Sequence, residues 1–151
     1  MTAHRWIFAA PLFAAASLAA CSAQPSAPVA EDAYVRLAAV PGRPAAGYFL
    51  LHGGAKDATL VQVAAPGAAR AELHTSRMTG NGMATMDSLA SVRVPARGSV
   101  AFAPGAQHVM LFGLPASVAA GGTLPLTLRF ADGSAVRADA RVIAAGDAAP
   151  E

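Results

Sequence analysis

Histidine and methionine side chains gather in one part of this 151-residue chain. Apart from the initiator, all the methionines and two of the four histidines lie between residues 74 and 110, namely His74, Met78, Met83, Met86, His108 and Met110. Thioether sulfur is a soft ligand that favours copper(I), and neutral imidazole also suits copper. Zinc sites normally use cysteine, histidine or carboxylate, and blue-copper centres need a cysteine thiolate. Two histidines with two methionines therefore predict a copper(I) site that is not tuned for redox chemistry.

The pair His108 and Met110 has a spacing that gives the two side chains a common direction. They are two residues apart in the run Gln107-His-Val-Met-Leu. On a β-strand, residues i and i+2 point to the same face, so Val109 and Leu111 point to the other face and into a core. Other strands or loops must bring His74 and a second methionine to this His-x-Met face.

The elements that carry these residues are predicted to be short strands, because helical spacing is rare between the glycine and proline breaks. Asp132-Gly133, between two alternating runs, predicts a hairpin turn. Evenly spaced short strands indicate an all-β fold, either a sandwich or a Greek-key barrel. We expect strands near Ala33–Val40, Gly47–His52, Thr59–Ala65, Ala71–Thr75, Met83–Leu89, Ser91–Val94, Ser99–Ala103, His108–Leu114, Thr123–Phe130 and Ala135–Ile143.

The N-terminal residues are typical of an exported protein. Trp6 to Ala20 is almost wholly apolar and ends in Leu18-Ala19-Ala20-Cys21, which resembles a bacterial lipobox. We therefore predict a signal peptide over 1–20, lipidation of Cys21, a flexible tether over 21–32, a folded domain over 33–143 and a disordered tail over 144–151. The alternative is a plain cleaved signal that a cysteine happens to follow. Lipidation would place the domain in the cell envelope facing the periplasm, and Ser22 favours the outer membrane.

Composition excludes several other classes of protein. The formal net charge is only +2 and the basic residues are spread out, which argues against nucleic-acid binding. Cys21 is the only cysteine, so no internal disulfide or internal thiolate site can form. We find no Ser-His-Asp set, paired catalytic carboxylates or phosphate loop, so an enzyme is not expected. We expect a monomer.

The stretch from His74 to Met110 resembles the PCu(A)C family of periplasmic copper chaperones. The family signature is His, about ten residues, Met, twenty-one residues and then His-x-Met. Twenty-one residues separate Met86 from His108 here, and eleven rather than ten separate His74 from Met86. The additional residue fits in the glycine-rich turn 80–82, where an insertion costs little. Ala71-Glu72-Leu73 before His74 also matches, and the resemblance covers essentially the whole folded part.

The resemblance implies a cupredoxin-like or immunoglobulin-like Greek-key fold and one copper(I) bound by His74, Met86, His108 and Met110. The spacing to His108 selects Met86 rather than Met83 as the ligand. It also implies a copper-accepting partner, such as the copper centre of a haem-copper oxidase or another assembly chaperone. Met78 and Met83 are either exposed residues of a mobile loop or a soft patch that helps to capture or hand over copper. His52 is interpreted as structural.

Two other functions fit the same sequence. One is a lipoprotein that buffers or imports copper through the same site. The other is an envelope β-sandwich lipoprotein that binds no metal.

Overall fold

The structure, a computed structural model, describes residues 25–150, so the predicted signal peptide and the predicted lipidation site Cys21 lie outside the described residues. The described residues form ten strands and contain no helix, which confirms the all-β prediction. Accordingly, no helix able to cross a membrane occurs in this part of the chain. The strands are β1 (Val29–Arg36), β2 (Ala45–His52), β3 (Ala58–Ala64), β4 (Arg70–Met78), β5 (Ala84–Leu89), β6 (Val92–Val94), β7 (Ser99–Phe102), β8 (Gln107–Phe112), β9 (Thr123–Phe130) and β10 (Ala135–Ile143).

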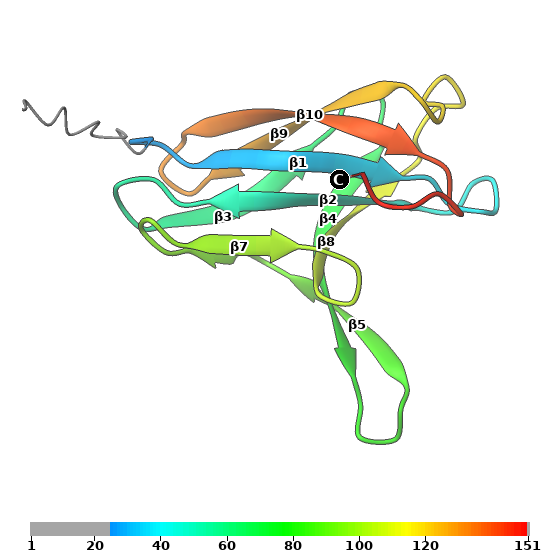
Figure 1. Ribbon diagram of the computed structural model, residues 1–151, viewed down its shortest axis with the longest axis horizontal. Coiled ribbons are helices and arrows are strands. Elements are labelled where there is room, and N and C mark those ends of the chain that lie inside the picture. The colour runs from blue at the N-terminus through cyan, green and yellow to red at the C-terminus, as the bar shows by residue number, and fades with distance from the viewer. Residues whose placement is uncertain (1–24, 151) are drawn as a thin grey trace, which may run out of the picture.

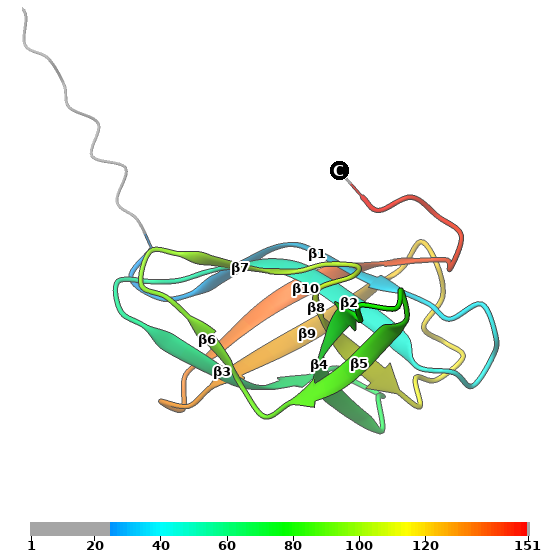
Figure 2. The same cartoon turned by 90° about the horizontal axis from the view of Figure 1, so that it is seen from below.

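All ten strands belong to one sheet with the order β5-β4-β8-β7-β2-β1-β10-β9-β3-β6. The sheet curls back on itself into a barrel-like shape (Figures 1 and 2). Most neighbours are antiparallel, but β1 runs parallel to β10, with Tyr34 opposite Arg141, and β7 runs parallel to β8. The predicted Asp132-Gly133 turn does join β9 to β10, with Gly133 at a φ of 86°. Glycine adopts this left-handed conformation without the steric cost that other residues meet.

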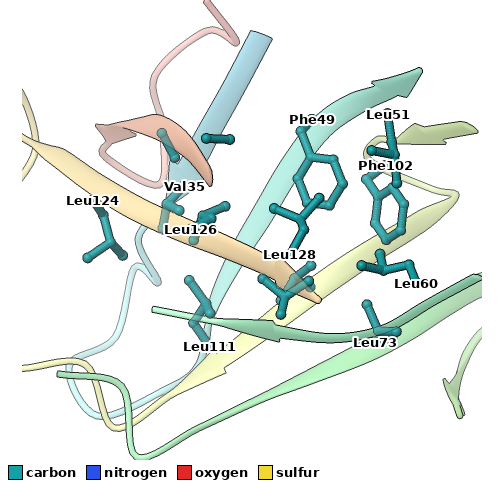
Figure 3. Close-up of a cluster of buried hydrophobic side chains, with 14 of the residues drawn as sticks. Val35, Phe49, Leu51, Leu60, Leu73, Phe102, Leu111, Leu124, Leu126 and Leu128 are labelled. Atoms are coloured by element: carbon teal, nitrogen blue, oxygen red, sulfur yellow. The ribbon is translucent and has the colours of Figure 1, made fainter. Parts of the chain in front are cut away.

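The core fills the inside of the curled sheet, where alternate residues such as Leu124, Leu126 and Leu128 of β9 point inward (Figure 3). Val109 and Leu111 of β8 are fully buried, as the alternation in the sequence predicted. Phe49 of β2 stacks on Phe102 of β7 with ring centroids 4.3 Å apart. Burial of each such side chain contributes on the order of 2 kcal/mol relative to exposure. This packing fixes β2 and β8, and with them the side chains that point to the outer face.

The outer face of β1 and β2 carries a second, smaller apolar cluster of Tyr34, Tyr48 and Ile143, with Ala46 packed against it. The two tyrosine rings lie 4.9 Å apart. Because Ala46 pairs with Met110 of β8, this cluster borders the outward-pointing residues of β8.

The strand β1 begins earlier than the sequence predicted. Residues 29–32 were assigned to the flexible tether 21–32, but Val29 pairs with His52 and Ala30 pairs with Leu51. The register then shifts between Glu31 and Tyr34, and Asp32 has a positive φ of 52°. A β-bulge of this kind breaks the alternation of side chains. The start of β1 therefore lacks the alternating pattern that marks a strand in a sequence.

The C-terminal residues 144–150 form no strand, but part of this predicted disordered tail has specific contacts. The Arg36 guanidinium donates hydrogen bonds to the carbonyl oxygens of Ala145 at 3.1 Å and Asp147 at 2.5 Å. The backbone N–H of Ala144 also donates to Asp147 Oδ2 at 2.8 Å. Arg36 is more than a hundred positions from Ala145 and Asp147 in the sequence. Local sequence patterns therefore give no sign of these contacts.

The β4–β5 hairpin projects from the barrel (Figure 1). Strand β4 pairs with β8 only from Arg70 to Thr75, whereas its pairing with β5 extends to Met78. The connecting turn is closed by Thr79, whose backbone N–H and hydroxyl both donate to the carbonyl oxygen of Met83 at 2.8 Å. The strand predicted near Ala71–Thr75 is therefore longer than expected and includes Met78.

Candidate metal site

Two histidines lie side by side on the outer face of the sheet. His74 of β4 and His108 of β8 occupy directly paired positions, so their side chains point the same way. Their ring centroids are 5.9 Å apart and their planes are inclined by only 28°. His108 is buried, with 6% of its surface exposed, and the His74 side chain is 14% exposed. The strand pairing thus brings together two imidazoles that are 34 residues apart in sequence.

The carboxylate of Glu72 holds the ring of His74. Glu72 Oε2 lies 3.0 Å from His74 Nε2, and Glu72 Oε1 accepts a hydrogen bond from Arg70 Nε at 2.8 Å. The hydrogen bonds from His74 and Arg70 lower the pKa of the Glu72 carboxyl, which favours its ionised form. Since an ionised carboxylate can only accept, Nε2 carries the ring proton in neutral His74. The lone pair of His74 is then on Nδ1.

Each histidine keeps one nitrogen free for a ligand. His74 Nδ1 is buried and has no hydrogen-bond partner among the described residues. In His108, Nδ1 faces the carbonyl oxygen of Ala106 at 3.1 Å and must donate to it, which leaves the lone pair on Nε2. Buried polar atoms are normally hydrogen-bonded, so the free Nδ1 of His74 calls for an explanation. A metal ion would use both lone pairs, with an oxygen atom fixing the other nitrogen of each ring.

The two predicted methionine ligands lie on the same face as the histidines. Met110 follows His108 by two positions on β8 and is opposite Glu72 of β4. Met86 of β5 is opposite Ser76 of β4. Together with Tyr48, the residues Ser76, Met86, His108 and Met110 line a shallow depression on the outer face. Met110 is half-buried, whereas Met86 is 61% exposed and forms the outer rim.

Tyr48 provides an aromatic wall to this depression. Its ring centroid lies 6.4 Å from that of His108. Burial, together with the neighbouring Tyr34, raises the pKa of the Tyr48 hydroxyl above its usual value near 10. Tyr48 therefore stays neutral and presents an apolar ring to the site.

The remaining candidates lie farther from the two histidines. His52 is at the far end of β2, where Nδ1 is 2.8 Å from Ser99 Oγ and Nε2 is 3.3 Å from Glu31 Oε2. Met78 and Met83 are near the tip of the β4–β5 hairpin, 73% and 61% exposed. Sequence reasoning missed the role of Glu72, although its position two residues before His74 on one strand was a usable signal.

The ligands available at this face are unusual in type. Among residues 25–150 no group of three or more histidine, cysteine, aspartate or glutamate side chains could hold a metal ion. The further side chains on this face that could bind a metal beside the His74–His108 pair include the thioethers of Met86 and Met110. Sulfur with imidazole selects soft ions such as copper(I) over calcium or magnesium.

Comparison with known proteins relates the chain to lipoproteins. Residues 29–142 match the family described as "Putative lipoprotein LpqE-like". The chain is also 40% identical over 82 residues to "Putative lipoprotein Lxx21020" of Leifsonia xyli subsp. xyli. That match covers 54% of this chain and 49% of the relative, so it spans about half of that protein's length.

Solved structures with the same fold include copper-binding domains. The copper(I) form of DR1885 from Deinococcus radiodurans is 30% identical, with a TM-score of 0.63, and the match covers 82% of this chain and 83% of that chain. The copper-bound PCuAC domain from PmoF2 is 22% identical, with a TM-score of 0.62 over 76% of this chain and 91% of that domain. The predicted relationship to the PCu(A)C family and its all-β fold is thus confirmed.

Proposed function

Because the chain belongs to the LpqE-like lipoprotein family and is related to PCu(A)C domains, we propose that it is a copper(I) carrier of the bacterial cell envelope. It binds one copper(I) through His74, Met86, His108 and Met110 and passes the ion to a copper-dependent protein. Copper is the cargo here, and the protein carries out no catalytic step.

The observation that carries this proposal is the pair of free imidazole nitrogens beside methionine sulfur. His74 Nδ1 is buried without a partner, and the adjacent His108 directs Nδ1 away to Ala106. Two neutral nitrogens and two neutral sulfurs add no charge, so the loaded site keeps the single positive charge of copper(I). They also lack the thiolate that a blue-copper redox centre requires. The donor set therefore suits storage and exchange of the ion.

The position of Met86 supports transfer as the purpose of the site. Met86 is 61% exposed, whereas His108 is buried. A partner can displace the exposed thioether first while the histidines still hold the ion. The accepting protein is a haem-copper oxidase, which receives the ion at its copper centre, or another assembly chaperone. Copper buffering or import through the same four ligands is the alternative.

The lipoprotein family description supports attachment to a membrane. In this proposal Cys21 carries the lipid, the domain faces the periplasm, and Ser22 favours the outer membrane. An anchored carrier searches for its membrane-bound acceptor in two dimensions rather than three.

Copper(I) titration of the purified protein against a chromophoric copper(I) chelator tests the binding step. We expect one equivalent to be taken up by the natural sequence and lost when His108→Ala is combined with Met110→Ala. His52→Ala is the matched control, because His52 lies at the other end of β2, and this variant should bind normally. If the double variant still takes up copper(I) as the natural sequence does, the assigned site is wrong.

Cytochrome oxidase activity in a deletion strain separates delivery from buffering or import. Loss of activity that added copper restores supports delivery to the oxidase. Normal oxidase activity combined with altered copper tolerance favours the buffering alternative.

A further inference from the structure

We propose that Met78 and Met86 form an outer copper(I) site made of two thioethers, through which the ion enters and leaves the inner site. This inference rests on the proposed function and deepens it, because it assigns an exchange step to a methionine outside the four predicted ligands. Met86 is shared between the two sites, and Met78 is the outermost ligand.

The pairing of β4 with β5 puts the two methionines on one face. Met78 pairs with Ala84, and Met86 pairs with Ser76, which is two residues before Met78. Met78 and Met86 are therefore diagonal neighbours on the face that also carries His74. Diagonal neighbours in an antiparallel pair are roughly 7–8 Å apart at Cα, within reach of long side chains. Methionine has three rotatable bonds, so both sulfurs can approach one ion.

Core packing does not account for these side chains. Met78 is 73% exposed and Met86 is 61% exposed, on a hairpin that projects beyond the barrel (Figure 1). The pairing of β4 with β8 ends at Thr75. One residue further on, the backbone N–H of Ser76 donates a hydrogen bond to the carbonyl oxygen of Ala106, at 3.0 Å. Three of the five large apolar side chains that are exposed in residues 25–150 are methionines of this hairpin.

The two faces of the hairpin differ in character. Arg77 and Asp87 lie 3.9 Å apart on the face opposite to Met78, by the alternation of side chains along β4 and β5. Met83 immediately precedes Ala84, so the same alternation directs it away from Met78. Between Met78 and His74 this face of the hairpin carries no charged side chain, and Glu72 and Arg70 lie on it only beyond His74. A copper(I) ion moving from Met78 to His74 therefore meets no cationic group.

The exchange is a substitution of ligands in which copper stays in the +1 state. On entry, Met78 and Met86 hold the ion, and a copper–sulfur bond to Met78 breaks as a copper–nitrogen bond to His108 forms. Release follows the reverse order. All the ligands involved are neutral, so no proton or electron is transferred.

The test compares Met78→Leu with Met83→Leu in the purified full-length protein. Both substitutions replace an exposed methionine at the tip of the same hairpin with a side chain of similar volume, and only Met78 lies on the copper face. Each protein is loaded with one equivalent of copper(I) and mixed with an excess of a chromophoric chelator in a stopped-flow instrument. We expect Met78→Leu to slow transfer on the order of tenfold, which corresponds to about 1.4 kcal/mol in the barrier. Met83→Leu should transfer copper at the natural rate.

The possible results separate this inference from the proposed function. An unchanged rate in Met78→Leu, or equal slowing in both variants, overturns the outer site while the inner site stands. Failure of the natural protein to load any copper(I) overturns the proposed function and the outer site together.

Discussion

Glu72 is expected to set the copper affinity although it is not one of the predicted ligands. Its carboxylate accepts from both His74 Nε2 and Arg70 Nε, at 3.0 and 2.8 Å. In Glu72→Gln only one end of the side chain accepts, and the amide nitrogen donates. If this nitrogen faces His74, Nε2 becomes an acceptor and the ring proton moves to Nδ1. The Nδ1 lone pair that the proposed site uses is then lost.

The size of the effect follows from the position of Glu72. Removing a group that orients a metal-binding histidine typically lowers metal affinity by about 10–100-fold. The Glu72 side chain is 39% exposed, and it orients only one of the two histidines. The amide oxygen also retains some ability to accept from His74. We therefore expect a loss of copper(I) affinity near the lower end of this range, on the order of tenfold.

Two measurements and one control make this expectation specific. Competition with a chromophoric chelator gives the copper(I) affinity, and ¹⁵N NMR of the copper-free protein shows which nitrogen of His74 is protonated. Glu31→Gln is the matched control, because Glu31 contacts His52 at 3.3 Å in the other glutamate–histidine pair. It should leave copper affinity unchanged. The reasoning is refuted if Glu72→Gln alters neither the affinity nor the His74 tautomer, or if Glu31→Gln lowers the affinity equally.

Two further predictions concern stability. Leu126→Ala removes most of a fully buried core side chain. It should lower the free energy of unfolding, measured by chemical denaturation, by about 2–5 kcal/mol. A smaller loss would indicate that the core collapses around the gap. The hydrogen bond from Arg93, followed by that from the Ala96 N–H, lowers the pKa of the Asp57 carboxyl. The unfolded chain therefore takes up a proton first as the pH falls, and this contribution to stability is present above about pH 4 and lost below it. Thermal melts from pH 7 to pH 3 should show a smaller decrease for Asp57→Asn than for the natural sequence, and parallel curves would contradict this origin.

Local sequence patterns were sufficient to predict the parts of the site that lie on one strand. The His108–Met110 direction followed from alternation alone, and burial of Val109 and Leu111 bears out the orientation of β8. The pairing of His74 with His108 was beyond such reasoning, because it depends on which strands become neighbours. Only the resemblance to a family with known spacing linked the two.

The predicted boundaries of the folded domain differ from the structure because they depend on features that local patterns do not reveal. The bulge between Glu31 and Tyr34 removed the alternation that marks a strand, so the start of β1 was assigned to the tether. The contacts of Arg36 with Ala145 and Asp147 arise from the parallel pairing of β1 with β10, which joins opposite ends of the chain. Neither a bulge nor a long-range contact leaves a periodic trace in the sequence.

The course of β2 gives the domain a polarity. One end of β2 has Ala46 beside Met110, and the other end has His52 beside Val29, where the chain enters the barrel. Six residue steps separate Ala46 from His52, a distance of about 20 Å along an antiparallel strand. A chain tethered ahead of β1 is thus held at one pole and offers its metal-binding face nearer the other. In the proposed function, the anchor at Cys21 is joined to the His52 end of β2, and the copper acceptor meets the end that carries Met110.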